Sequence, residues 1–101
     1  MNSKLIDSKT IIEDAARDLW QGQGADISAI NDTLSVVTDE ILSIAELLSE
    51  EDKATTISYI KNALSDFKRA YEARDDFLLA DCLYYEWREM LFIYIDVSQE
   101  G

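Results

Sequence analysis

A run of apolar residues at helical spacing constrains the fold of this chain more than any other feature. Seven apolar residues between residues 27 and 48 recur at alternating steps of three and four, the a/d pattern of a helix that packs along one stripe. They are Ile27, Ile30, Leu34, Val37, Ile41, Ile44 and Leu48. The pattern predicts a helix over residues 26–48, with Asp26 as its N-cap.

Three further segments show helical spacing, and the chain has no proline to interrupt them. We expect these helices at residues 8–20, 50–74 and 76–96. Together with the first, they predict an all-α protein, a small up-and-down bundle of about four helices. The whole chain, residues 1–101, then forms a single domain, because chains of this length normally do.

Short polar residues and glycines mark the expected helix ends. Asp7 or Ser8 is the expected cap of the first helix, and Ser49 that of the third. The expected apolar stripes are Ile12, Ala15, Ala16 and Leu19 in the first helix, Ile57, Ile60, Leu64, Phe67 and Tyr71 in the third, and Phe77, Ala80, Tyr84, Trp87, Leu91 and Tyr94 in the fourth. Between the last two, the spacing slips at residues 74–76, which predicts a break there or one long kinked helix.

The composition excludes several classes of function. With 9 basic and 21 acidic residues the net charge is −12, which argues against direct nucleic-acid binding. The absence of histidine and the single cysteine exclude a Cys/His zinc site, a histidine base and a disulfide framework. We therefore expect no catalytic residues, no metal and no cofactor. No leader or membrane span is evident, which predicts a cytoplasmic protein.

The last expected helix is unusually apolar, with 15 apolar or aromatic residues among the 19 from Phe77 to Ile95. Glu86 lies on its apolar side, where a carboxylate is costly without a partner. Three readings stay open. Glu86 pairs with a side chain of another helix, for which Arg17, Lys61, Arg69 and Arg74 are candidates, or it faces a groove or partner protein, or it is an acid with a raised pKa.

The same helix supplies the candidate partner-binding residues, because some of its apolar surface exceeds what a small domain can bury. They are Asp81, Tyr85, Glu86, Trp87 and Arg88. Cys82 is interpreted as a small buried hydrophobe, since no histidine exists to activate it. Trp20 is interpreted as a core residue or as an exposed anchor for a partner.

Residues 76–86 resemble a helical pattern, D-[YF]-x-L-A-D-x-L-x-Y-E, of small segments in bacterial motility-associated proteins, including the ends of motility-associated glycosyltransferases. The matching residues are Asp76, Phe77, Leu79, Ala80, Asp81, Leu83, Tyr85 and Glu86. Where the pattern often continues with a proline, this chain continues with Trp87. The resemblance implies a helical accessory module without catalytic residues of its own, in which Asp81 and Glu86 are pattern positions.

These observations favour a non-catalytic protein–protein interaction module, an accessory or chaperone-like bacterial protein that binds another protein or itself as a homodimer. The regular seam from Ile27 to Leu48 is the candidate self-association surface. The alternative is an acidic mimic of nucleic acid that blocks a nucleic-acid-binding protein. Asp32, Asp39 and Glu46 support it, because they repeat every seven residues and form an acidic stripe.

Overall fold

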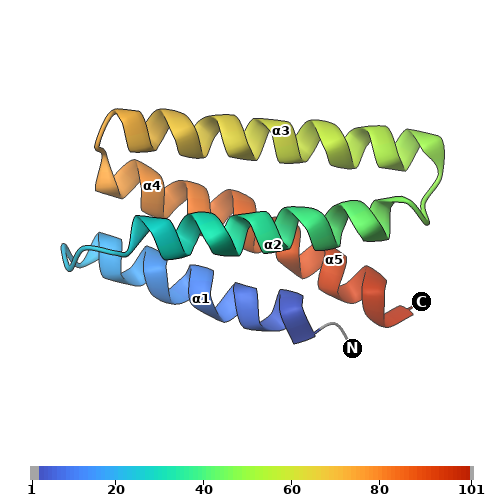
Figure 1. Ribbon diagram of the computed structural model, residues 1–101, viewed down its shortest axis with the longest axis horizontal. Coiled ribbons are helices and arrows are strands. Elements are labelled where there is room, and N and C mark those ends of the chain that lie inside the picture. Colours follow the sequence, from blue (N-terminus) through green and yellow to red (C-terminus); the bar gives the residue numbers. More distant parts are fainter. Residues whose placement is uncertain (1–2, 101) are drawn as a thin grey trace.

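The computed structural model describes the backbone of residues 3–100 and the side chains of residues 3–96. Four helical rods run up and down along one long axis (Figure 1), so the expected all-α bundle is confirmed. They are α1 (Ser3–Trp20), α2 (Ile27–Ala45), α3 (Glu50–Glu72), and a last rod made of α4 (Asp76–Cys82), the π-helical turn η1 (Leu83–Trp87) and α5 (Arg88–Glu100). Within residues 3–100, none of the helices has the length and apolar character that a bilayer crossing requires.

Short polar side chains start three of the helices. Asp26, Ser49 and Asp75 each accept a hydrogen bond from the backbone N–H three residues later, at 3.1, 3.2 and 3.0 Å. Each bond satisfies one N–H that a helix start leaves without an intrahelical partner. The predicted caps at Asp26 and Ser49 are therefore confirmed.

The first helix begins earlier than the sequence pattern predicted. It starts at Ser3, so Asp7 and Ser8 lie inside α1 and the expected cap there is wrong. Leu5 is fully buried and extends the apolar stripe by two turns before Ile12. Burial of this early side chain explains why the helix continues toward the N-terminus.

The break between the third and fourth rods settles the question of one long helix or two. α3 ends at Glu72, and Arg74 adopts a φ of 54°, in the left-handed region. The Asp75 N–H then bonds the Ala70 carbonyl at 3.1 Å, and the Arg74 N–H bonds the Tyr71 carbonyl at 3.1 Å. This is the Schellman ending of a helix, made here by an arginine where glycine is usual.

The α2 seam forms part of the chain's own core. Ile30, Leu34, Val37 and Ile41 are at most 3% exposed, and they pack in one cluster with residues of the other rods. Ile27 and Ile44 are half-buried against the same cluster, and Leu48 is also half-buried. The centre of the seam is therefore occupied within the protomer, which leaves only its half-buried ends for the self-association that the sequence suggested.

The expected stripes of α3 and the last rod are partly wrong. Leu64, Tyr71 and Phe77 were expected inside, yet they are 41%, 51% and 66% exposed. The buried residues of α3 are Thr56, Ile60, Ala63, Phe67 and Ala70. Small side chains on this face let α4 approach closely, whereas the stripe was chosen by hydrophobicity alone.

The π-helical turn changes the phase of the last rod. The Arg88 N–H bonds the Leu83 carbonyl, five residues earlier, where an α-helix would reach back four. The extra residue rotates α5 by roughly 100° relative to the course of α4. In Figure 1 α5 leans away from α3, and it reaches α3 through the Tyr94 hydroxyl, which hydrogen-bonds to the Thr56 hydroxyl.

Candidate functional site

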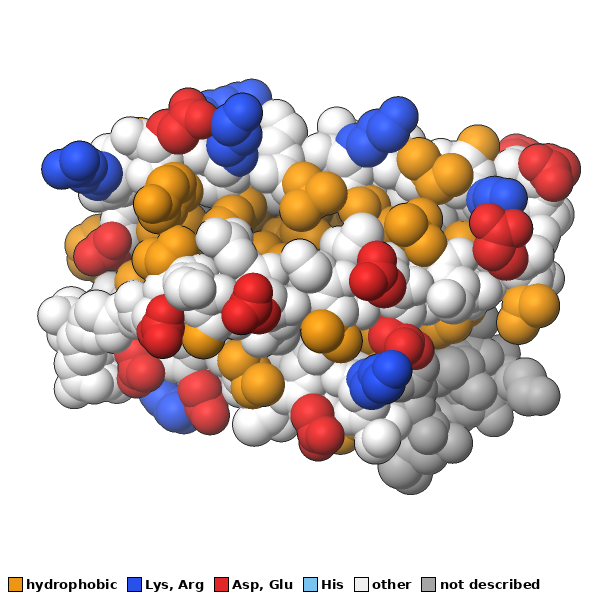
Figure 2. All heavy atoms as spheres, in the orientation of Figure 1, with side chains coloured by type: hydrophobic (Ala, Val, Ile, Leu, Met, Phe, Trp, Pro, Cys, Tyr) orange, Lys and Arg blue, Asp and Glu red, His pale blue; other side chains and the backbone are white. Residues whose placement is uncertain are grey.

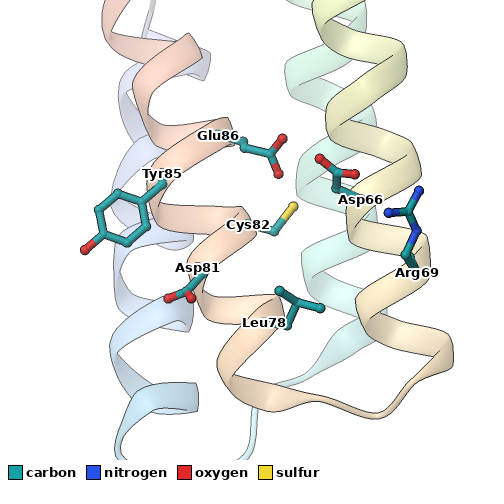
Figure 3. A pocket seen from close by; sticks show the side chains of 7 residues that line it. All are labelled: Asp66, Arg69, Leu78, Asp81, Cys82, Tyr85 and Glu86. Carbon is teal, nitrogen blue, oxygen red and sulfur yellow. The ribbon is translucent and has the colours of Figure 1, made fainter.

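An open cleft lies between α3 and the first half of the last rod. Its volume is about 290 Å³, and it is lined by Asp66, Arg69, Leu78, Asp81, Cys82, Tyr85 and Glu86. We call this set the acidic cleft. Figure 3 shows Glu86, Cys82 and Leu78 on the side of the rod that faces α3, while Tyr85 and Asp81 point to the opposite side. The cleft therefore has an inner wall against α3 and an outer rim beyond it.

The inner wall places two carboxyl groups opposite each other. Glu86 on η1 and Asp66 on α3 point toward one another across the cleft (Figure 3). Burial raises the pKa of Glu86 above its ordinary value, and Asp66 raises it further by accepting a hydrogen bond from the protonated acid. The Cys82 thiol, which lies on the same side of the rod as Glu86, acts on this pKa in the opposite direction.

No basic side chain neutralises this pair in the described part of the chain. Arg69 also lines the cleft, but it lies beyond Asp66 in Figure 3, and the salt bridges among residues 3–96 do not include Asp66 or Glu86. The expectation that Glu86 pairs with a basic residue or tyrosine of another helix is therefore not met. Its partner is a second acid, which leaves the other two readings of Glu86 open.

Cys82 is a buried free thiol, as the sequence suggested. Its sulfur lies 3.7 Å from the carbonyl oxygen of Ala63 on α3 and donates toward it. Burial raises the pKa of the Cys82 thiol strongly, and the carboxylate of Glu86 adds to the shift. A thiol held protonated in this way is a poor nucleophile.

The outer rim carries an aromatic cluster that joins the last rod to α1. The Trp20 ring lies 5.1 Å from Tyr84 and 6.2 Å from Tyr85 between ring centroids, both at tilted angles. The Trp20 Nε1–H donates a hydrogen bond of 3.1 Å to Asp81 Oδ1. Trp20 is thus half-buried and serves to pack α1, while 60% of Tyr85 stays exposed.

Two of the expected partner-binding residues lie away from the surface. Trp87 is fully buried, which puts it out of reach of a partner and corrects that expectation. Arg88 is 15% exposed in its side chain, and its guanidinium carbon lies 3.9 Å from the centroid of the Tyr84 ring. Asp81, Tyr85 and Glu86 remain at the cleft.

The one thiol that lines the cleft, Cys82, is kept protonated by burial and by the neighbouring Glu86 carboxylate. In residues 3–96, no group of three or more carboxylate or cysteine side chains is placed to hold a metal ion. What the cleft offers chemically is negative charge beside exposed apolar surface.

Asp66 of α3 was not predicted at this site, and Arg69 was predicted only as one of four candidate partners of Glu86. A signal for Asp66 was present, since it lies on one helical face with Ala63 and Ala70, which are both fully buried. An acid between two small residues at this spacing faces an approaching helix. Comparisons of this chain with protein-family models, curated proteins and solved structures find no match. The resemblance of residues 76–86 to motility-associated segments therefore stays a prediction.

Proposed function

We propose that this chain is a non-catalytic interaction module that binds a basic amphipathic segment of another protein across the acidic cleft. The observation that carries the proposal is the pairing of exposed apolar and acidic side chains around this one cleft, with Leu78 on its inner wall and Tyr85 on its outer rim. Leu78 and Tyr85 are 44% and 60% exposed and lie two helical turns apart. Asp81 lies between them along the chain, and Glu86 and Asp66 lie on the α3 side.

Charge complementarity determines the chemistry of the partner. The chain has a net charge of −12, and Asp66 and Glu86 have no salt-bridge partner among residues 3–96. A partner with lysines or arginines on either side of an apolar stripe would cover Leu78 and Tyr85 and place its charges against these carboxylates. The π-helical turn beneath Tyr85 and Glu86 adds support, because such turns are frequent at functional sites.

The test uses a synthetic helical peptide of lysine and leucine, labelled with fluorescein and titrated with the protein while anisotropy is recorded. We expect Tyr85→Ala to weaken binding by about tenfold. The matched control is Tyr59→Ala, because Tyr59 is 42% exposed on α3 and lies outside the cleft. Equal losses in both variants, or equal binding of a peptide with glutamine in place of lysine, would refute the proposal.

A second copy of this chain could bind the acidic cleft instead of another protein. Sedimentation velocity of the protein alone distinguishes the two. Self-association would make the sedimentation coefficient rise with concentration, and Tyr85→Ala would abolish that rise. This result would assign the acidic cleft to a second copy of the chain and contradict the proposed partner. A single monomeric species across the concentration range supports it.

The acidic mimic of nucleic acid is the second candidate, and the exposure of the α2 stripe favours it. Asp32, Asp39 and Glu46 are all exposed, and Figure 2 shows acidic side chains over α2 below a band of hydrophobic ones. A mimic binds through charge alone, so its binding falls steeply with salt. Binding of an oligo-arginine peptide that is lost in Asp32→Asn/Asp39→Asn and kept in Tyr85→Ala would favour this function.

A further inference from the structure

The pair of carboxyl groups between α3 and η1 has a consequence that stands on its own geometry, whether or not the proposed function holds. Asp66 and Glu86 come from two rods that meet at this cleft, and their carboxyl groups point toward one another. The cleft lies where α3 approaches the last rod most closely, because α5 leans away further along. A change in the interaction of this pair therefore acts directly on the contact between α3 and the last rod.

We propose that Asp66 and Glu86 form a pH-sensitive clasp that holds α3 against η1 while Glu86 carries its proton and loosens that interface when Glu86 is ionised. In the closed form the Glu86 carboxylic acid donates its O–H to the Asp66 carboxylate. Loss of the proton to solvent leaves two carboxylates in place of one acid and one carboxylate. Two like charges at this separation repel each other, and the hydrogen bond between them is gone.

The other charged and titratable groups at the cleft make no salt bridge with Asp66 or Glu86 among residues 3–96. Arg69 of α3 lies beyond Asp66 and has no salt bridge with either acid. Asp81 of α4 points to the outer rim, where it accepts a hydrogen bond from Trp20. The Cys82 thiol stays protonated at neutral pH and donates toward the Ala63 carbonyl of α3. The Tyr85 hydroxyl points away from α3 (Figure 3), and neither α1 nor α2 contributes a lining residue.

The direction of the pH dependence follows from the proton balance. In the folded chain the pKa of Glu86 lies above its ordinary value of 4.5. The folded state therefore keeps a proton at pH values where the unfolded chain has already lost it. The stabilisation is fully present below the ordinary pKa, and it is lost as the pH rises through the raised one. The clasp thus holds in mildly acidic solution and opens toward neutral pH.

Thermal unfolding followed by circular dichroism from pH 4.5 to pH 8 tests this in the intact chain. Glu86→Gln imitates the protonated acid, because its amide donates to Asp66 at every pH. We expect it to melt about 2–4 °C above the natural chain at pH 8, with the difference shrinking toward pH 4.5. The control is Asp32→Asn, which removes one charge at an exposed site of α2 and should give a small shift that is even across this range.

A second measurement tests the clasp in the natural chain, so it does not depend on whether a variant folds. Carbon-13 NMR of the natural chain follows the titration of the Glu86 side-chain carboxyl directly, and we expect a midpoint above 4.5. Asp66→Asn should lower that midpoint, because an amide donates to the ionised Glu86. A midpoint at or below 4.5, no change in Asp66→Asn, or equal pH profiles for Glu86→Gln and the natural chain would overturn the clasp.

Discussion

α1 and α3 both pack against the last rod, and the two interfaces are built from different side chains. On the α1 side, Trp20 contacts Tyr84 and Tyr85, and the Lys9 amino group lies 4.4 Å from the centroid of the Phe92 ring. On the α3 side, the buried residues include Thr56, Ala63 and Ala70, and the contacts include the Cys82 thiol and the Glu86 carboxyl. Large aromatic and apolar groups thus hold α1, whereas α3 adds small and polar groups to its buried Ile60 and Phe67.

The two interfaces should differ in how they respond to pH and salt. Burial of apolar area depends little on pH or salt, so the α1 side is a fixed platform. Carboxyl pairs and thiols change their interactions with protonation, so the α3 side is the one that solution conditions can alter.

Truncation of a buried side chain of α1 should cost more stability than truncation of an exposed apolar side chain of α3. Ile12 is 1% exposed, so Ile12→Ala should lower the free energy of unfolding by about 2–5 kcal/mol. Leu64 on α3 is 41% exposed, and Leu64→Ala should cost less than about 1 kcal/mol. Urea unfolding of both variants measures the difference. Similar losses in the two helices would remove the basis of the comparison.

Chemical labelling of Cys82 probes the α3 side directly, because its thiol is covered by the Ala63 backbone. Burial raises the pKa of this thiol, so the folded chain should react with iodoacetamide at pH 8 at least ~100-fold more slowly than a free cysteine. Mass spectrometry over time gives the rate. Labelling in native buffer at the rate of free cysteine would show that α3 does not cover the thiol.

The polar contact between α1 and α4 should matter less than the packing around it. Asp81→Ala removes the acceptor of the 3.1 Å hydrogen bond from Trp20, which should cost about 0.5–1.5 kcal/mol in unfolding free energy. Asp96→Ala is the control, because Asp96 is exposed on α5. If the two variants lose equal stability in urea unfolding, the Trp20–Asp81 bond contributes nothing to the α1 side.

Features set by neighbouring residues were predictable from the sequence, and features set by contacts between distant residues were not. The caps at Asp26 and Ser49 are local, since a short side chain bonds a backbone N–H three residues away. The α2 seam was also predictable, because the centre of its stripe is surrounded by the core. The site followed only in part, since Asp81, Tyr85 and Glu86 were predicted and Arg69 was named as a candidate partner of Glu86, while Asp66 was not predicted.

The errors in the predicted stripes of the last rod and of α3 have different physical causes. The π-helical turn inserts one residue, so a wheel drawn at constant pitch through the last rod misplaces every residue after Trp87. On α3, the face toward the last rod is lined by Ala63 and Ala70, whose small side chains carry little hydrophobic signal. A prediction that looks for large apolar side chains therefore assigns Leu64 and Tyr71 to the buried face of α3, although both are exposed.

The smallest predicted effect concerns how α1 and α3 end. Both close with the same arrangement of backbone hydrogen bonds, but the left-handed position is Gly22 after α1, with a φ of 73°, and Arg74 after α3, with a φ of 54°. A residue with a Cβ atom is strained in the left-handed conformation by roughly 1–2 kcal/mol, and glycine avoids this strain. Glycine also makes the unfolded chain more flexible, which lowers the stability of the folded state by about 0.5–1 kcal/mol. We therefore expect Arg74→Gly to raise the unfolding free energy by about 0.5–1 kcal/mol, measured by urea denaturation.

Two variants separate the backbone effect from the loss of charge. Arg74→Ala removes the same guanidinium and keeps the strain, so it should give no gain in stability. Gly22→Ala is the reverse experiment, since a Cβ at Gly22 would meet no atom within 4 Å and only the backbone conformation is affected. It should cost about 1 kcal/mol. A gain in Arg74→Ala equal to that in Arg74→Gly would mean that the side chain, and not the left-handed backbone, is what weakens the end of α3.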